Sequence, residues 1–233
     1  MNIKKDYIKV FLLLITAIFF LFTLSSCKLW TVVELNKENT TSANNVNLDG
    51  ENTNLTEYVD KLWSENVVPY IVEESKKNEA SEVIAAIKND QENAGEQYGI
   101  RESAAGTPWK YIVSGEARII SLNTESRNGT VGLDLQPYDD EVDLKMQVGP
   151  VIQGTTIRDS LDFISFDNFG NQIEYAQFSS ELNDKVNQEV LNGFNFEDLL
   201  NQEINFKGVV VKDSSELIIT PVEIALLEEE NND

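Results

Sequence analysis

The chain of 233 residues carries 40 acidic against 18 basic side chains and no histidine, so its net charge at pH 7 is −22. Such an acidic surface repels phosphate backbones, which argues against a nucleic-acid partner. The lack of histidine excludes Ser-His-Asp and Cys-His catalysis and most zinc, copper and non-haem iron sites. Hydrophobic residues make up 41% of the chain, enough to bury a core of one or two domains.

Residues 1–26 have the order of a secretory signal peptide. Three lysines precede a continuous apolar run over residues 10–23 (VFLLLITAIFFLFT), which is too short to span a bilayer, since a spanning helix needs about 20 residues. Small residues and Cys27 follow, an ending that resembles the lipobox of bacterial lipoproteins. Cys27 is the only cysteine. The sequence therefore predicts a mature chain held to the membrane by a lipid on Cys27, and the alternative is an uncleaved signal anchor.

Residues 27–54 are interpreted as the anchor, a short strand and a flexible stretch. The strand is predicted over residues 29–35 (LWTVVEL). The stretch over residues 38–54 is rich in Asn, Thr and Glu, a composition typical of flexible segments.

Residues 55–105 have the periodicity of helices. The first predicted helix places four apolar residues on one stripe, and Pro69 is expected to interrupt it, leaving residues 70–76 as a second piece. Two more helices are predicted over residues 79–89 and 90–99, the last with Asp90 as its N-cap. The stripe consists of Val59, Leu62, Trp63 and Val67. The tryptophans Trp30, Trp63 and Trp109 are interpreted as core contacts rather than ligand platforms.

Residues 106–233 have the periodicity of strands. A long β-rich segment over residues 111–122 is followed by a hairpin signal, Asn128-Gly129, and by alternating apolar residues over 131–135 and 142–148.

The last part of the chain predicts one helix and two strands. The helix is expected to start at Ser179 or Ser180 and to end at Gly193. The strands, over residues 205–211 and 217–227, are joined by a turn at residues 213–215. Together these elements predict a mainly β fold, an antiparallel barrel or sheet, with a helical insertion.

Residues 149–154 (GPVIQG) have the glycine spacing of a phosphate-binding loop. The position of the essential lysine is occupied by Thr155, and Pro150 lacks the backbone N–H that such a loop points at phosphate. Val151 and Ile152 are β-branched. The glycines are therefore interpreted as a bend or bulge of the sheet.

One long block carries a resemblance to a known family. Residues 148–176 (VGPVIQGTTIRDSLDFISFDNFGNQIEYA), together with residues 97–101 (QYGIR) and 219–222 (ITPV), resemble a family of predicted periplasmic lipoproteins of unknown function. The same family pattern includes Trp63 with residues 67–69 (VVP) and Cys27-Lys28. Gly170 departs from this pattern, in which a threonine is expected at that position. The resemblance implies an OB-like antiparallel β-barrel over residues 106–233 with a small inserted helical subdomain over 55–105. It also implies association with sugar ABC importers, but no activity.

Arg158 and Asp159 allow two interpretations. In the favoured interpretation, they are an adjacent charged pair that braces the barrel. Alternatively, they belong to a ligand- or partner-binding site, in which planar polar groups are interleaved with aromatic rings as a sugar or peptide would require. The candidate residues for such a site are Arg158, Asp159, Asn168, Asn171, Gln172 and Glu174. OB barrels do bind oligosaccharides, but a fold alone licenses no function.

The acidic run Asp139-Asp140-Glu141-Asp143 could offer oxygen ligands to Ca²⁺. Because it lacks the glycine and the spacing of an EF-hand loop, a solvated loop is favoured and no metal site is predicted. No cofactor is predicted either.

The sequence therefore favours a non-enzymatic, lipid-anchored envelope protein, and the resemblance implies that it is an accessory or partner-binding component of a sugar ABC uptake system. One alternative is a carbohydrate-active enzyme that uses carboxylates of residues 159–174. Another is a purely structural envelope component.

The lipidation of Cys27 can be tested directly. Cys27→Ser should release the protein from the membrane or leave an unprocessed precursor, because no other cysteine can accept the lipid. The measurement is fractionation of cells grown with a labelled fatty acid. Normal processing and retained label in the variant would end the lipoprotein interpretation.

Overall fold

The computed structural model describes residues 45–46, 53–101 and 107–227, all within one compact unit. The predicted signal peptide, Cys27, Trp30 and the strand predicted over residues 29–35 lie outside the described residues. Among the described helices, none combines the length and the hydropathy needed to cross a bilayer.

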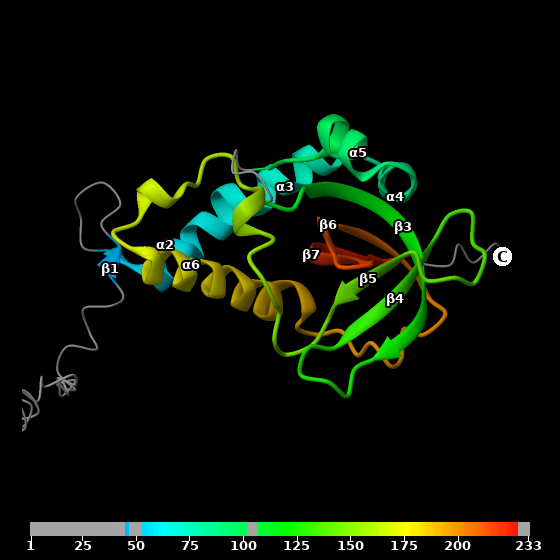
Figure 1. The fold of residues 1–233 in the computed structure, drawn as a ribbon. Helices are drawn as coiled ribbons and strands as arrows, with labels where there is room; N and C mark the ends of the chain where they lie inside the picture. The colour runs from blue at the N-terminus through cyan, green and yellow to red at the C-terminus, as the bar shows by residue number, and fades with distance from the viewer. Residues whose placement is uncertain (1–44, 47–52, 102–106, 228–233) are drawn as a thin grey trace, which may run out of the picture. The chain divides into compact units, whose positions relative to one another are not determined.

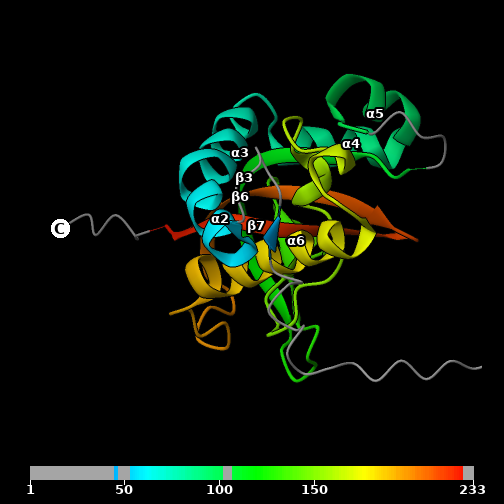
Figure 2. The same ribbon diagram turned by 90° about the vertical axis from the view of Figure 1, so that its left-hand side faces the viewer.

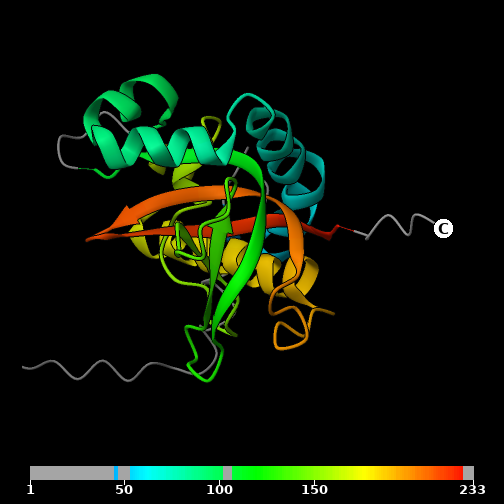
Figure 3. The same ribbon diagram turned by 90° about the vertical axis from the view of Figure 1, so that its right-hand side faces the viewer.

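Five strands form a closed barrel in the order β3-β4-β5-β7-β6 (Figure 1). Figure 3 views this end of the molecule, with β6 in orange and β7 in red beside the green β3. The strands are β3 (Lys110–Asn123), β4 (Thr130–Leu135), β5 (Leu144–Gln147), β6 (Glu203–Asp213) and β7 (Glu216–Leu226). The mainly β, OB-like barrel is thus confirmed. It is not wholly antiparallel, because β5 and β7 pair in parallel.

The strand pairs follow local sequence signals. β3 and β4 pair antiparallel on either side of the Asn128-Gly129 turn, and β6 and β7 form a hairpin around residues 214 and 215. Both predicted turns are confirmed. The strand predicted over residues 142–148 is shorter than expected, because only β5 pairs and Val142 is 42% exposed.

The GPVIQG segment is held at both ends by backbone geometry. The Gly129 carbonyl accepts hydrogen bonds from the N–H groups of Val148 (2.9 Å) and Gly149 (3.0 Å), and a Cβ at Gly149 would clash with the Gly129 backbone. At the other end, the buried Gln147 side chain accepts from Gln153 N (2.8 Å) and donates to its carbonyl oxygen (3.3 Å). The glycine is needed for close backbone approach.

A helical segment precedes the barrel strands. It contains α2 (Leu55–Leu62), a π-helical turn (Trp63–Val67), α3 (Val68–Ser75), α4 (Ala80–Asn89) and α5 (Gln91–Tyr98). Pro69 was expected to interrupt the first helix, but the chain stays helical through it. The Val68 N–H donates to the Trp63 carbonyl, five residues back, and Pro69 lies in the first turn of α3, where its missing donor costs little.

The helices and the barrel share one hydrophobic core. Trp63 and Ile71 of the helical segment are as fully buried as Tyr111 and Phe206 of the barrel and belong to the same cluster. Polar contacts join the two parts as well, since Ser114 Oγ of β3 donates to the Ser75 carbonyl (3.0 Å). Figure 1 shows α4 and α5 beside β3. The segment is therefore packed on the barrel over a continuous apolar surface.

Two of the three tryptophans, Trp63 and Trp109, lie within the described residues, and the predictions for both agree with this packing. Trp63 is buried in the core. Trp109 packs against the α5 backbone at Gly95 and Gly99, with the Arg101 guanidinium 3.8 Å from its ring.

The helix between β5 and β6 begins earlier than predicted. α6 (Gln172–Lys185) has Asn171 as its N-cap, whose side chain accepts from Ile173 N (2.9 Å) and Glu174 N (3.1 Å). The predicted start at Ser179 or Ser180 is wrong, because the first two turns carry no regular apolar stripe that would have marked them as helix. A π-helical turn (Val186–Leu191) follows, and the predicted end at Gly193 is confirmed by its φ of 103°.

Two short strands precede α2. β1 (Asn45–Val46) and β2 (Thr53–Asn54) pair antiparallel within the stretch that was predicted to be flexible. Asn54 caps α2 by accepting from Thr56 N (3.0 Å).

Candidate functional site

Asp159 is the centre of a largely buried charge network. Its Oδ1 accepts from Arg158 Nε (2.8 Å) and Nη2 (2.6 Å), while its Oδ2 lies 3.2 Å from Lys110 Nζ on β3 and accepts from Thr155 Oγ1 (2.6 Å). The side chains of Lys110, Arg158 and Asp159 are only 6%, 12% and 13% exposed. One carboxylate thus holds two cations from different parts of the chain, a geometry that suits a brace.

Arg158 extends this network to α6. Its Nη1 donates to the Tyr175 carbonyl (3.3 Å), and its guanidinium carbon lies 3.8 Å from the centre of the Tyr175 ring. That ring in turn packs on Phe166 (5.6 Å) and Phe169 (5.1 Å between centroids). Cation–π and aromatic contacts of this kind add to the burial energy of the rings. Phe166, Phe169 and Tyr175 of the block therefore pack on one another.

The other candidate residues of this block make local turn contacts. Asn168 Oδ1 accepts from Ser165 N (2.8 Å), which closes a capping box. Glu174 accepts from Gly170 N (3.0 Å) and from Asn171 Nδ2 (2.9 Å), beside the cap that Asn171 itself forms. Gln172 is exposed at the start of α6. The structure pairs Arg158 with Asp159, whereas Asn168, Asn171 and Glu174 shape the loop and the helix start.

A small cavity of roughly 330 Å³ adjoins Asp159. Its lining includes Lys110, Gln147, Gln153 and Thr155. Residues of the charge network and of the GPVIQG turn therefore both line this cavity.

The acidic run after β4 is organised around a buried carboxylate. Asp134, which alternates with the apolar residues of β4, is fully buried and accepts from Arg118 Nη2 (2.8 Å) and from the N–H groups of Asp139 (3.2 Å) and Asp140 (3.1 Å). Burial by itself would raise the pKa of Asp134, but the hydrogen bond from Arg118 and those of the two N–H groups outweigh it and lower the pKa below 3.8.

Two cations lie against the carboxylates of the same run. Carboxylate oxygens of Asp134, Asp139 and Asp143 lie within 4.8 Å of one another. Arg118 pairs with the first of them, and Lys88 of α4 pairs with the third (2.5 Å). The charges of the two cations already offset much of the carboxylate repulsion.

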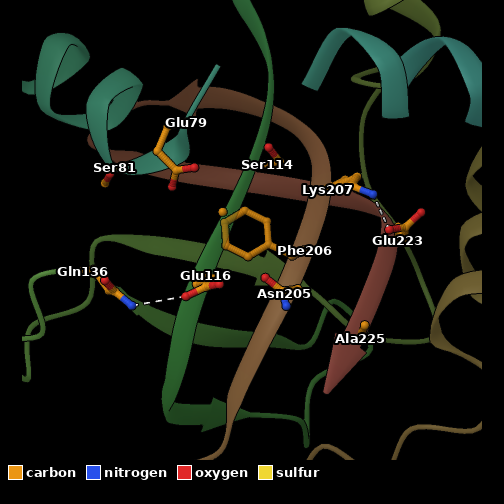
Figure 4. Close-up of a pocket in the computed structure, with 11 residues that line it drawn as sticks. Glu79, Ser81, Ser114, Glu116, Gln136, Asn205, Phe206, Lys207, Glu223 and Ala225 are labelled. Carbon is orange, nitrogen blue, oxygen red and sulfur yellow. Dashed lines mark hydrogen bonds and ion pairs between the residues drawn. The ribbon is translucent and has the colours of Figure 1, made fainter. Parts of the chain in front are cut away.

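A larger groove lies on the barrel where β3, β6 and β7 run side by side (Figure 4). It has a volume of roughly 680 Å³ and a mixed lining of carboxylates, amides and hydroxyls around the Phe206 ring. The lining residues are Glu79, Ser81, Ser114, Gly115, Glu116, Gln136, Asn205, Phe206, Lys207, Glu223 and Ala225.

The strands fix the polar groups of this groove. Asn205 is paired in register with Glu116 across β3 and β6, so the two side chains stand on the same face of neighbouring strands. Gln136 Nε2 donates to Glu116 Oε2 (3.2 Å), and Lys207 Nζ pairs with Glu223 Oε1 (2.5 Å). Figure 4 shows Glu79 and Glu116 on either side of Phe206.

Glu79 has a perturbed pKa. Desolvation by burial is the largest cause and raises the pKa of Glu79 above 4.5. A hydrogen bond from the Ser81 backbone lowers the pKa, whereas the negative charges of Glu116 and Glu82 raise it further. The groove thus holds one carboxyl group whose proton is bound more firmly than usual.

None of these groove residues was a candidate from the sequence. They come from α4, from the strands β3, β6 and β7, and from the end of β4. Most of them are polar residues, which are common on the exposed faces of strands. Only the register between β3, β6 and β7 brings them together.

A barrel of this topology, with a helix between its third and fourth strands, defines the class of OB-fold proteins. The family described as predicted periplasmic lipoprotein (DUF2291) matches residues 17–225, and the chain belongs to this family. The protein is accordingly a lipid-anchored protein of the cell envelope.

Comparison with solved structures supports the fold. An OB-fold protein from Thermotoga maritima MSB8, solved at 1.90 Å, is 18% identical, with a TM-score of 0.62 over 76% of this chain and 100% of the other. At this identity the likeness speaks for the fold alone. No curated protein matches the chain.

The network geometry predicts the relative cost of breaking it. Asp159→Asn should lower stability by about 3–5 kcal/mol, because both Lys110 and Arg158 lose their shared partner in a buried place. Arg158→Ala should cost less, since Lys110 still neutralises Asp159. If Arg158 and Asp159 were an isolated adjacent pair, the order of the two stability losses would be reversed, with the larger loss for Arg158→Ala.

The measurement is urea unfolding of both variants, with Glu57→Gln on the exposed face of α2 as the matched control. Two variants that unfold like the parent, within about 0.5 kcal/mol, would contradict the brace.

Proposed function

We propose that this lipoprotein is a non-enzymatic accessory component of a sugar uptake system, and that it contacts a sugar through the groove of β3, β6 and β7. The observation that carries the proposal is the groove itself, an open polar depression of roughly 680 Å³ on the side of an OB barrel. The connection with sugar import rests on the family resemblance of the block over residues 148–176.

The lining suits a polyhydroxylated ligand. Carboxylates accept hydrogen bonds from sugar hydroxyls, and the amides of Gln136 and Asn205 can both donate and accept. Lys207 and Glu223 already neutralise each other, so the pair offers hydrogen bonds without a strong local field. A few polar groups placed on rigid strands are the usual means of orienting a small ligand.

The non-enzymatic part of the proposal rests on the residue inventory. The chain has no histidine, and its only cysteine is the predicted lipid acceptor. Two of the four carboxylates of residues 159–174 are poorly suited to act as an acid and base, because Asp159 is engaged by two cations and Glu174 by the helix start.

A second candidate function is glycoside hydrolysis in the same groove. Glu79 has a raised pKa, as a general acid requires, and Glu116 lies across Phe206 from it. Two carboxyl groups that flank the scissile bond are the minimal equipment of such enzymes. This candidate differs from the first in requiring turnover.

One experiment separates these functions. The protein is titrated calorimetrically with a panel of mono- and oligosaccharides, and the corresponding nitrophenyl glycosides are assayed for product release. Binding without release is expected, and Asn205→Ala and Glu116→Gln should each weaken it by about tenfold, the equivalent of one good hydrogen bond.

Glu57→Gln serves as the control, because it removes an exposed carboxylate of α2 that does not line the groove. Product release that disappears in Glu79→Gln would instead establish the enzyme. Neither binding nor release across the panel would contradict both candidates and leave a structural role.

A further inference from the structure

Three apolar side chains are exposed in and just after the loop that leads into α6. Phe163 is 39% exposed, Phe166 43% and Ile173 69%. These three residues are called the aromatic loop surface below. Three large apolar side chains exposed within eleven residues of one segment make it a candidate contact surface.

The aromatic loop surface has a firm base. The Phe163 ring packs edge-on against Tyr70 of α3 (5.4 Å between centroids), and Phe166 packs edge-on against Tyr175 of α6 (5.6 Å). Beneath it, Phe169 and Phe178 are buried in the core. The exposed side chains are therefore presented by a packed platform.

The chain coming from Cys27 enters the fold beside this platform. β2 leads directly into α2, and one turn into α2 the Tyr58 ring lies 6.3 Å from that of Phe178, which is itself 5.0 Å from Phe169. Lys185 of α6 also pairs with Asp60 of α2 (2.6 Å).

Figures 1 and 2 show the same arrangement from two sides. In both views, β1 and the first turns of α2 and α6 lie together, and Figure 1 shows the barrel strands away from them.

We propose that the aromatic loop surface rests on the lipid headgroup layer of the membrane to which the chain is anchored. The proposal depends on the lipid at Cys27. Residues 28–44 separate that cysteine from β1, and a chain of this length reaches at most about 60 Å. Such a tether keeps the surface at a high effective concentration near the bilayer, so a weak contact suffices.

The chemistry favours lipid of no net charge. Phenylalanine and isoleucine side chains insert at the boundary of headgroups and acyl chains, and no basic side chain occurs among residues 159–184 to attract anionic lipid. Asp162 and Asp167 are exposed within the loop and would repel it. A zwitterionic bilayer is therefore the surface that fits.

The test uses the full lipidated protein in vesicles of phosphatidylcholine and phosphatidylethanolamine. With Cys27 blocked by its lipid, which mass spectrometry checks first, Ile173→Cys supplies a single thiol for an environment-sensitive fluorophore. Val142→Cys is the matched control, because Val142 is 42% exposed and lies next to β5 on the barrel.

The label at position 173 should shift its emission to shorter wavelength and be quenched by brominated acyl chains, while the label at position 142 should stay as in water. Phe163→Ser together with Phe166→Ser should reduce the quenching at position 173. Equal signals at both positions, or no quenching at 173, would overturn the proposal. A shift that appears only in native membranes and not in pure lipid would overturn it too, in favour of a protein partner.

Discussion

A single carboxylate, that of Asp159, holds together parts of the chain that are far apart in sequence. It binds Lys110 at the start of β3 and Arg158 in its own turn, and Arg158 continues the contact to Tyr175 of α6. Two cations around one anion leave a net positive charge in a largely buried place, and removal of the anion is therefore costlier than removal of either cation. The barrel, the loop that closes it and the helix beneath it depend on this arrangement.

The network also explains why a block rich in polar and aromatic residues can be structural. Its charges are satisfied inside the protein, and its caps set the start of α6. Once these groups are engaged, the surfaces left for function lie elsewhere. The polar groove is on the barrel, whereas the exposed Phe163, Phe166 and Ile173 lie in and just after the loop that leads into α6. The proposed ligand contact and the proposed membrane contact thus lie on different parts of one core.

Much of the fold could be predicted because its signals are local. The Asn128-Gly129 hairpin, the Asp90 cap and the stop at Gly193 each depend on a few neighbouring residues. The start of α6 was missed although its Asn171 cap is also a local signal, because the first turns that follow carry no regular apolar stripe and Tyr175 instead packs on Phe169.

The burial of Asp134 and the polar groove were missed for a related reason. Asp134 alternates with apolar residues of β4 as a solvent-facing residue would, and its burial is made favourable by Arg118 on the neighbouring strand and by the N–H groups of Asp139 and Asp140. The groove residues are brought together by strand register over more than a hundred positions, from Glu79 to Glu223. A single sequence carries no signal for such a long-range arrangement, whereas it did indicate the Arg158–Asp159 pair, which is adjacent in the chain.

The most direct test of the shared carboxylate is a double-mutant cycle of Lys110→Met and Asp159→Asn, with unfolding free energies from urea titration. The double variant should be more stable than the sum of the single losses implies, by at least about 1 kcal/mol, because removal of Lys110 relieves one of the two cations that Asp159→Asn strands. Losses that add within about 0.5 kcal/mol would show that the two side chains do not act on each other and would contradict the account.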